Sequence, residues 1–87
     1  MSVAGYGEDM EPVEVTASFD LGGVITPHRF TWQQVDYPVA SVGRRWMDEA
    51  GQHILVMVPG DRVFELLYEP PTGLWYLRRF DGGSSLA

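Results

Sequence analysis

Residues 63–80 read VFELLYEPPTGLWYLRRF, and this stretch carries the clearest indication of the fold class. From Arg62 to Glu69, side chains alternate along the chain with the period of two that is typical of a β-strand. The next four residues, PPTG (70–73), end that strand, because two prolines and a glycine favour a turn. LWYLRRF (74–80) is rich in the aromatic residues that strands prefer. The stretch therefore predicts two consecutive strands joined by a turn.

The second of these strands raises a functional question, because GLWYLRRF (73–80) places aromatic residues beside two arginines. Proteins that bind single-stranded nucleic acid use such residues to stack bases and to neutralise phosphates. Neighbouring residues of a strand point to opposite faces, however, so Arg78 is expected to lie on the face of Tyr76 and Arg79 on the face of Trp75. We expect one arginine to project into solvent and the other to lie over the core edge or pair with an acid. The candidate acids are Asp48, Glu65, Glu69 and Asp81.

The rest of the chain between residues 12 and 80 shows the same period of two. PVEVTASFD (12–20) alternates cleanly, and a second strand near residues 24–33 is expected to be interrupted by Pro27. Pro38 places the third strand, which can extend to residue 47, at an edge of the sheet or gives it a bulge there. A single helical turn over WMDEA (46–50) is the alternative to that extension. HILVMV (53–58) is continuously apolar, which is typical of a strand buried on both faces near the middle of the sheet.

Six short strands separated by turn signals predict a single all-β domain over residues 12–80. We expect an antiparallel meander, curled into a small barrel or a strongly twisted sheet. Residues 1–11 and 81–87 lack any periodicity and are expected to be a disordered acidic arm and a disordered tail.

The composition suits a small globular domain that relies on its core. The chain has 87 residues, is 45% hydrophobic and contains no cysteine, so neither disulfides nor thiolate metal sites can support the fold. No segment has the pattern of a signal peptide or the length of a membrane span, and we expect a cytoplasmic protein. The net charge of −6 is concentrated in the first twenty residues, and all six cations are arginine. An acidic balance of this kind disfavours contact with nucleic acid.

The sequence offers little that is typical of catalysis. No G-x-S-x-G, H-E-x-x-H or phosphate-binding glycine motif occurs, and the chain has no lysine. The two histidines, His28 and His53, are 25 positions apart, and we expect both to lie on strands with their rings at the rim of the sheet. We therefore predict that the protein is not an enzyme, and we expect neither a cofactor nor a metal site.

Two clusters remain as candidates for binding, and each joins a tryptophan to adjacent arginines: GRRW (43–46) and WYLRRF (75–80). Their residues have two interpretations. The aromatic rings can belong to the core with the arginines at its rim, or they can form a contact surface for a partner. If the second holds, the sequence assigns the surface to Arg44, Trp46, Trp75 and Arg79.

A family resemblance covers residues 28–80. The order F-x-W (30–32), D-Y-P-V-A-S-V-G-R-R-W (36–46) and V-F-E-L-L-Y-E-P-P-T-G-L-W-Y-L-R-R-F (63–80) resembles a small uncharacterised all-β domain of bacteria. That domain occurs alone and is similar to the C-terminal segment of inactive Y-family polymerase relatives that assist mutagenic DNA repair. T-G-x-W-Y-L (72–77) is the most specific element, whereas the DEAG loop (48–51) is shorter than the family pattern.

The resemblance implies a non-enzymatic accessory domain, and it brings no catalytic residues with it. Our leading hypothesis is a protein-interaction module associated with bacterial DNA repair or replication. Direct binding of single-stranded nucleic acid, through Trp46, Trp75 and Tyr76, is one alternative. A homo-oligomer, such as a dimer paired through an exposed edge strand, is the other.

Overall fold

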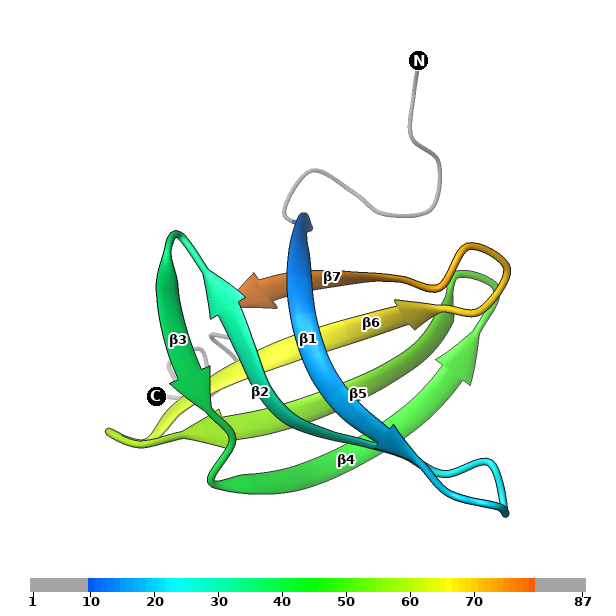
Figure 1. The fold of residues 1–87 in the computed structure, drawn as a ribbon, viewed down its shortest axis with the longest axis horizontal. Coiled ribbons are helices and arrows are strands. Elements are labelled where there is room, and N and C mark those ends of the chain that lie inside the picture. Colours follow the sequence, from blue (N-terminus) through cyan, green and yellow to red (C-terminus); the bar gives the residue numbers. More distant parts are fainter. Residues whose placement is uncertain (1–9, 80–87) are drawn as a thin grey trace, which may run out of the picture.

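The computed structural model describes residues 10–79, which form an all-β domain of seven antiparallel strands (Figure 1). The sequence predicts six strands, and the additional one arises because residues 35–48 form two strands. The strands are β1 (Glu11–Phe19), β2 (Ile25–Trp32), β3 (Val35–Pro38), β4 (Ser41–Asp48), β5 (Gly51–Val58), β6 (Arg62–Glu69) and β7 (Leu74–Arg79).

The strands form one curled sheet in the order β3-β2-β1-β7-β6-β5-β4. β1 turns the corner of this sheet, because Glu11–Val13 pairs with β7 whereas Glu14–Phe19 pairs with β2. Figure 1 shows the consequence: β1, β2 and β3 cross steeply over the strands β4 to β7. The predicted meander curled into a barrel-like sheet is confirmed, and the sheet stops short of closure, with β3 and β4 as its edges.

The break between β3 and β4 lies at two residues that connect the two halves of the sheet. The amide of Val39 donates to the carbonyl of His28 on β2 at 2.9 Å, and the amide of Ala40 donates to the carbonyl of Met57 on β5 at 2.7 Å. Because the chain passes here from the half that contains β2 to the half that contains β5, β3 and β4 cannot form one continuous strand. Pro38 lies in an edge strand, as the sequence predicts, but β3 ends at this residue instead of continuing to residue 47.

Pro27 lies within β2 and does not interrupt it, contrary to the prediction. The register of β1 against β2 shifts between Thr16 and Ala17, which pair with Arg29 and Pro27, so that His28 is the extra residue of a bulge. A bulge accommodates a proline because one residue leaves the ladder. It also changes the side-chain alternation, which leaves Pro27 buried and His28 exposed.

The core fills the space between the two crossing halves. Phe30 on β2 packs edge-to-face on Phe64 of β6, with ring centroids 5.3 Å apart, and Tyr37 of β3 stacks on Phe30. The buried core side chains are Ile25, Phe30, Trp32, Ile54, Val56, Val58, Phe64, Leu66, Trp75 and Leu77. Trp32 is buried, and its indole nitrogen donates to Glu11 Oε1 at 3.2 Å.

Three further predictions, on the burial of β5, on residues 46–50 and on the ends of the chain, have different outcomes. β5 is buried as predicted on its core face, but it is the second strand from the edge, and its other face exposes Met57. Residues 46–50 contain no helical turn, since they form the end of β4 and a tight turn. The predicted disordered segments lie outside the described residues, except for Met10 and Glu11, and Glu11 begins β1.

Candidate functional site

A network of charged side chains lies on the outer face of the sheet, the side away from the core. The pairing of β5 with β6 and of β6 with β7 positions it: Glu65 on β6 lies opposite Arg78 on β7, and His53 on β5 is diagonal to Glu65. Asp48, at the end of β4, reaches the same histidine. We call these four residues the outer-face network: Asp48, His53, Glu65 and Arg78.

Glu65 is the centre of the network and is almost completely buried, with 1% of its side chain exposed. Its two oxygens have different partners. His53 Nδ1 donates to Oε2 at 2.6 Å, and Arg78 Nη2 donates to Oε1 at 2.7 Å. The buried carboxylate is thus bound by charged or polar donors on both oxygens, as a buried charge requires.

His53 is bound on both ring nitrogens, since Nε2 donates to Asp48 Oδ1 at 2.9 Å. Each ring nitrogen of His53 therefore has a carboxylate oxygen within hydrogen-bond distance, one from β6 and one from the end of β4. The hydrogen bond from His53 is the largest cause that lowers the pKa of Asp48 below its ordinary value of 3.8, and the amide of Ala50 adds to it.

An aromatic and cationic stack covers this network. The indole ring of Trp46 lies parallel to His53, with an interplanar angle of 3° and centroids 4.9 Å apart. The guanidinium of Arg44 lies 5.3 Å from the centroid of Trp46. The prediction that both histidines sit at the rim is therefore wrong for His53, which is buried. His28 is exposed and bonds Ser18 Oγ at 2.9 Å.

The four binding residues assigned from the sequence do not form one surface. Arg44 and Trp46 lie together on the outer face. Trp75 is on the opposite side, where it is 8% exposed and packs on Tyr68 in the core. Arg79 is exposed and lies opposite Phe64, on the face of Trp75, as the alternation predicts. Trp75 thus has the core role that the first of the two interpretations assigned to it.

Most arginines have partners inside the domain. Arg78 pairs with Glu65, which is one of the acids proposed from the sequence, and Arg29 pairs with Asp36 at 3.5 Å. Arg62 lies over the rings of Tyr37 and Phe64. Within residues 10–79, Arg44, Arg62 and Arg79 are the arginines with neither an acid partner nor a hydrogen bond.

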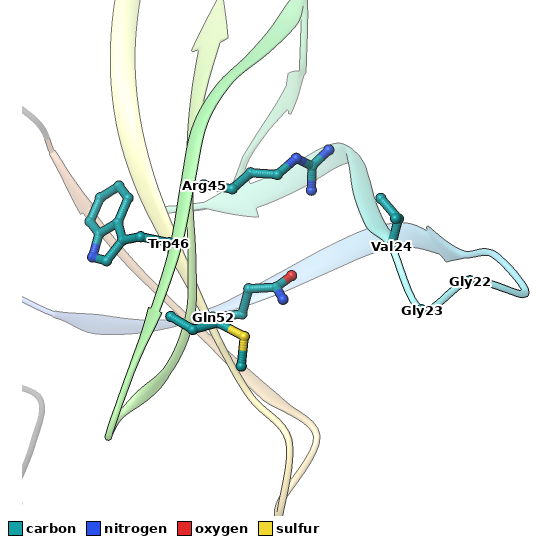
Figure 2. Close-up of a pocket in the computed structure, with 7 residues that line it drawn as sticks. Gly22, Gly23, Val24, Arg45, Trp46 and Gln52 are labelled. Carbon is teal, nitrogen blue, oxygen red and sulfur yellow. The ribbon is translucent and has the colours of Figure 1, made fainter.

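A second region, an apolar cleft of about 270 Å³, lies where the curled sheet fails to close. We call it the mouth cleft. It separates the β1–β2 turn from the β4–β5 hairpin, and Figure 2 shows Val24 of the turn facing the Arg45 side chain, whereas the Trp46 ring leaves the other face of β4. Its lining residues are Gly22, Gly23, Val24, Arg45, Trp46, Met47 and Gln52.

Large apolar side chains are exposed around the mouth cleft. Met47 is 70% exposed, Val24 is 46% exposed, and Leu21 at the tip of the turn is fully exposed. Phe19, at the end of β1, is half exposed and packs edge-to-face on Tyr68. This region lies away from the charged and aromatic clusters that the sequence singles out, so it was not predicted. The available signal was an LGGV turn (21–24) with apolar residues where polar turn residues are usual.

Neither region has the donor set of a metal centre: within residues 10–79, no group of three or more His, Cys, Asp or Glu residues could hold a metal ion. The same residues include no helix that is both long and apolar enough to cross a membrane. Comparisons of the chain with protein-family models, with curated proteins and with solved structures found no significant match.

Proposed function

We propose that this protein is a non-enzymatic binding domain and that it contacts a protein partner through the mouth cleft. One observation carries the proposal: Leu21, Val24 and Met47 are exposed around a cleft at an edge of the sheet. A small domain gains stability by burying such side chains, and exposed apolar patches that surround a cleft commonly mark interaction sites. A protein partner would supply the burial that the fold itself omits.

The state of His53 supports a binding role rather than catalysis. A general base needs a free ring nitrogen within reach of a substrate. Both nitrogens of His53 are bound to carboxylates, and Trp46 stacks on the ring. The arrangement suits the stabilisation of the outer face of the sheet.

The arginines support a protein partner rather than a nucleic acid. Single-strand binders need free cations beside accessible aromatic faces. Here Arg78 is paired with Glu65, Trp75 is in the core, and one face of Trp46 is stacked on His53. The resemblance of residues 28–80 adds a setting to the proposal, because it implies a partner from bacterial DNA repair or replication.

Site-specific photo-crosslinking in the native host tests this proposal. The photoreactive residue p-benzoylphenylalanine replaces Met47 at the mouth cleft or, as the matched control, Val35 on β3. Both residues are apolar and exposed, at 70% and 49%. We expect a discrete protein adduct from position 47 and none from position 35. The same adducts from both positions, or none from position 47, would contradict the proposal.

A further inference from the structure

The mouth cleft lies against the edge strand β4 and the adjoining face of the β4–β5 hairpin. Arg45, Trp46 and Met47 are consecutive and all line it. Side chains of consecutive strand residues point to opposite faces, so Arg45 and Met47 share the cleft-side face with Gln52 of β5. The Trp46 ring leaves the other face, so Trp46 lines the cleft with its backbone (Figure 2). The cleft therefore presents the edge of a strand to whatever enters it.

This edge has no strand beside it in the described part of the chain. β4 is the last strand of the sheet, and β3 pairs with β2 only from Arg29 onward. The first half of β2 therefore faces β4 across the gap without pairing. A single side chain bridges them, because Arg45 Nη1 donates to the carbonyl of Ile25 at 2.6 Å. Unpaired backbone groups on such an edge are a template for another strand.

The wall opposite β4 consists largely of bare backbone. Gly23 adopts φ +89°, which suits glycine, and a Cβ placed there would meet nothing within 4 Å. At Gly22 the nearest neighbour of such an atom would be Asp20 Oδ1, at 3.5 Å. The two glycines leave room for a second backbone between the turn and β4, and Val24 and Met47 supply apolar contacts on either side.

The charges near the cleft select the kind of segment that fits. Asp20 accepts hydrogen bonds from the amides of Gly22 and Val24, which places its carboxylate at the rim. Glu49 is exposed in the β4–β5 turn. Of the two arginines of β4, Arg45 donates to the Ile25 carbonyl, and Arg44 lies over the Trp46 ring on the outer face. A second copy of this chain, with its net charge of −6, would bring further acids to an acidic rim.

We infer that the mouth cleft binds an extended, basic segment of a partner protein, which adds as a strand to the free edge of β4. One apolar side chain of the segment lies between Val24 and Met47, and flanking lysine or arginine side chains face Asp20 and Glu49. Main-chain hydrogen bonds supply affinity and the apolar contact supplies specificity, as in other cases of strand addition. This inference rests on the proposed function and specifies its partner.

Peptide display on the full chain tests both the site and the partner. A library of random linear peptides is selected on the native protein, and the enriched peptides are then measured against Met47→Gln and Met47→Leu. Since Met47 is largely exposed, both variants should fold. We expect peptides with an apolar residue flanked by lysine or arginine, about tenfold weaker on Met47→Gln and nearly unchanged on Met47→Leu.

A double variant tests whether the acids near the cleft are required for binding. Asp20→Asn with Glu49→Gln removes both acids and keeps an oxygen that can accept the turn hydrogen bonds of Asp20. Two exposed ion pairs should account for about a three- to tenfold loss of affinity, which high salt abolishes. The control is Asp61→Asn in the β5–β6 turn, where asparagine tolerates the φ of +61°. It should leave affinity unchanged.

The mode of binding is tested by N-methylation of the selected peptide, one amide at a time. Strand addition predicts that alternate methyl groups weaken binding about tenfold or more, because alternate amides donate to β4. A uniform response would overturn strand addition. Enriched peptides without basic residues, insensitive to the Asp20 and Glu49 variant, would overturn the charge requirement while the cleft remains a binding site. If no peptide depends on Met47, or if the chain dimerises through this edge, both the inference and the proposed function fail.

Discussion

The outer-face network and the mouth cleft share the β4–β5 hairpin, yet they differ in how completely their groups are satisfied. In the network, the buried Glu65 has a donor on each oxygen and His53 has an acceptor on each nitrogen. At the cleft, Val24 and Met47 expose apolar surface, and no strand among residues 10–79 lies beside the edge of β4. Within these residues, the groups of the network are paired, and the apolar side chains and strand edge of the cleft are not.

This difference separates stability from binding. Buried charges that are fully paired contribute little to binding but cost several kcal/mol of stability when one partner is removed. Exposed apolar side chains contribute little to stability, and their removal affects a partner instead. Substitutions in the network should therefore destabilise the domain, and substitutions at the cleft should leave its stability nearly unchanged and impair binding.

The largest effect is expected at Gly51, because this residue begins β5 between the two regions. Its φ is +146°, and an added Cβ would collide with the carbonyl of Tyr68. Gly51→Ala should lower the free energy of unfolding by about 4 kcal/mol, from backbone strain and overpacking together. Urea denaturation measures this. Gly60→Ala, with φ +93° and no such collision, is the control and should cost about 1 kcal/mol. Equal losses in the two variants would show that the collision is relieved.

Removal of Glu65 should have the next largest effect. Glu65→Ala leaves His53 and Arg78 without their shared carboxylate beneath the outer face. We expect a loss of about 3 kcal/mol in urea denaturation. Glu14→Ala, an exposed acid on β1, should change stability by less than about 0.5 kcal/mol. A small loss in Glu65→Ala would mean that the network is not a source of stability.

Trp46 contributes to both regions, so its substitution tests whether they act separately. Its ring stacks on His53 and points away from the cleft, whereas its backbone lines the cleft (Figure 2). Trp46→Ala should cost about 1 kcal/mol of stability from the lost stack, and Trp46→Phe should recover part of it. The affinity for peptides selected at the cleft should change little. A large loss of affinity in a folded Trp46→Ala variant would place the contact on the outer face.

The loss of folding stability at acid pH should depend on Asp48. The pKa of Asp48 is lowered in the folded state by its hydrogen bond from His53, so the unfolded chain binds a proton at this site more readily. The stabilisation is complete well above pH 3.8 and is lost as the pH falls below that value. Between pH 5 and 2.5, roughly the window of carboxylate titration, the melting temperature of Asp48→Asn should decrease less steeply with falling pH than that of the wild type. Glu49→Gln, the neighbouring exposed acid, is the control and should retain the wild-type slope.

The smallest effect on stability is expected at Met47. Met47→Gln removes an apolar side chain that is 70% exposed, so the free energy of unfolding should change by less than about 0.5 kcal/mol. The same variant should abolish the photo-crosslink from a neighbouring cleft position, such as Val24. A loss of stability above about 2 kcal/mol would show that Met47 belongs to the core, and the distinction between the two regions would fail.

The alternation of residues was sufficient to predict the class of fold and the faces of the last strand. Arg78 and Arg79 lie on opposite faces, and Arg78 pairs with an acid named in advance, Glu65. The bulge at Pro27 and the break at Val39 were not predictable, because each depends on where the sheet bends to pack on itself. The burial of His53 was missed for a related reason: its two carboxylates come from β6 and from the end of β4, and only the sheet register brings them together.

Sequence by itself determined the period, the turns and therefore the antiparallel all-β architecture, since these depend on local backbone preferences and on which side chains avoid water. The tertiary structure decided which charges meet, which tryptophan is in the core and where the curled sheet stays open. These outcomes depend on the register and curvature of the sheet, which are set by many contacts between residues distant in the chain. LWYLRR (74–79) is for that reason the central strand of the sheet, between β1 and β6, whereas the exposed apolar surface lies at the mouth cleft, beside a turn with no charged cluster of its own.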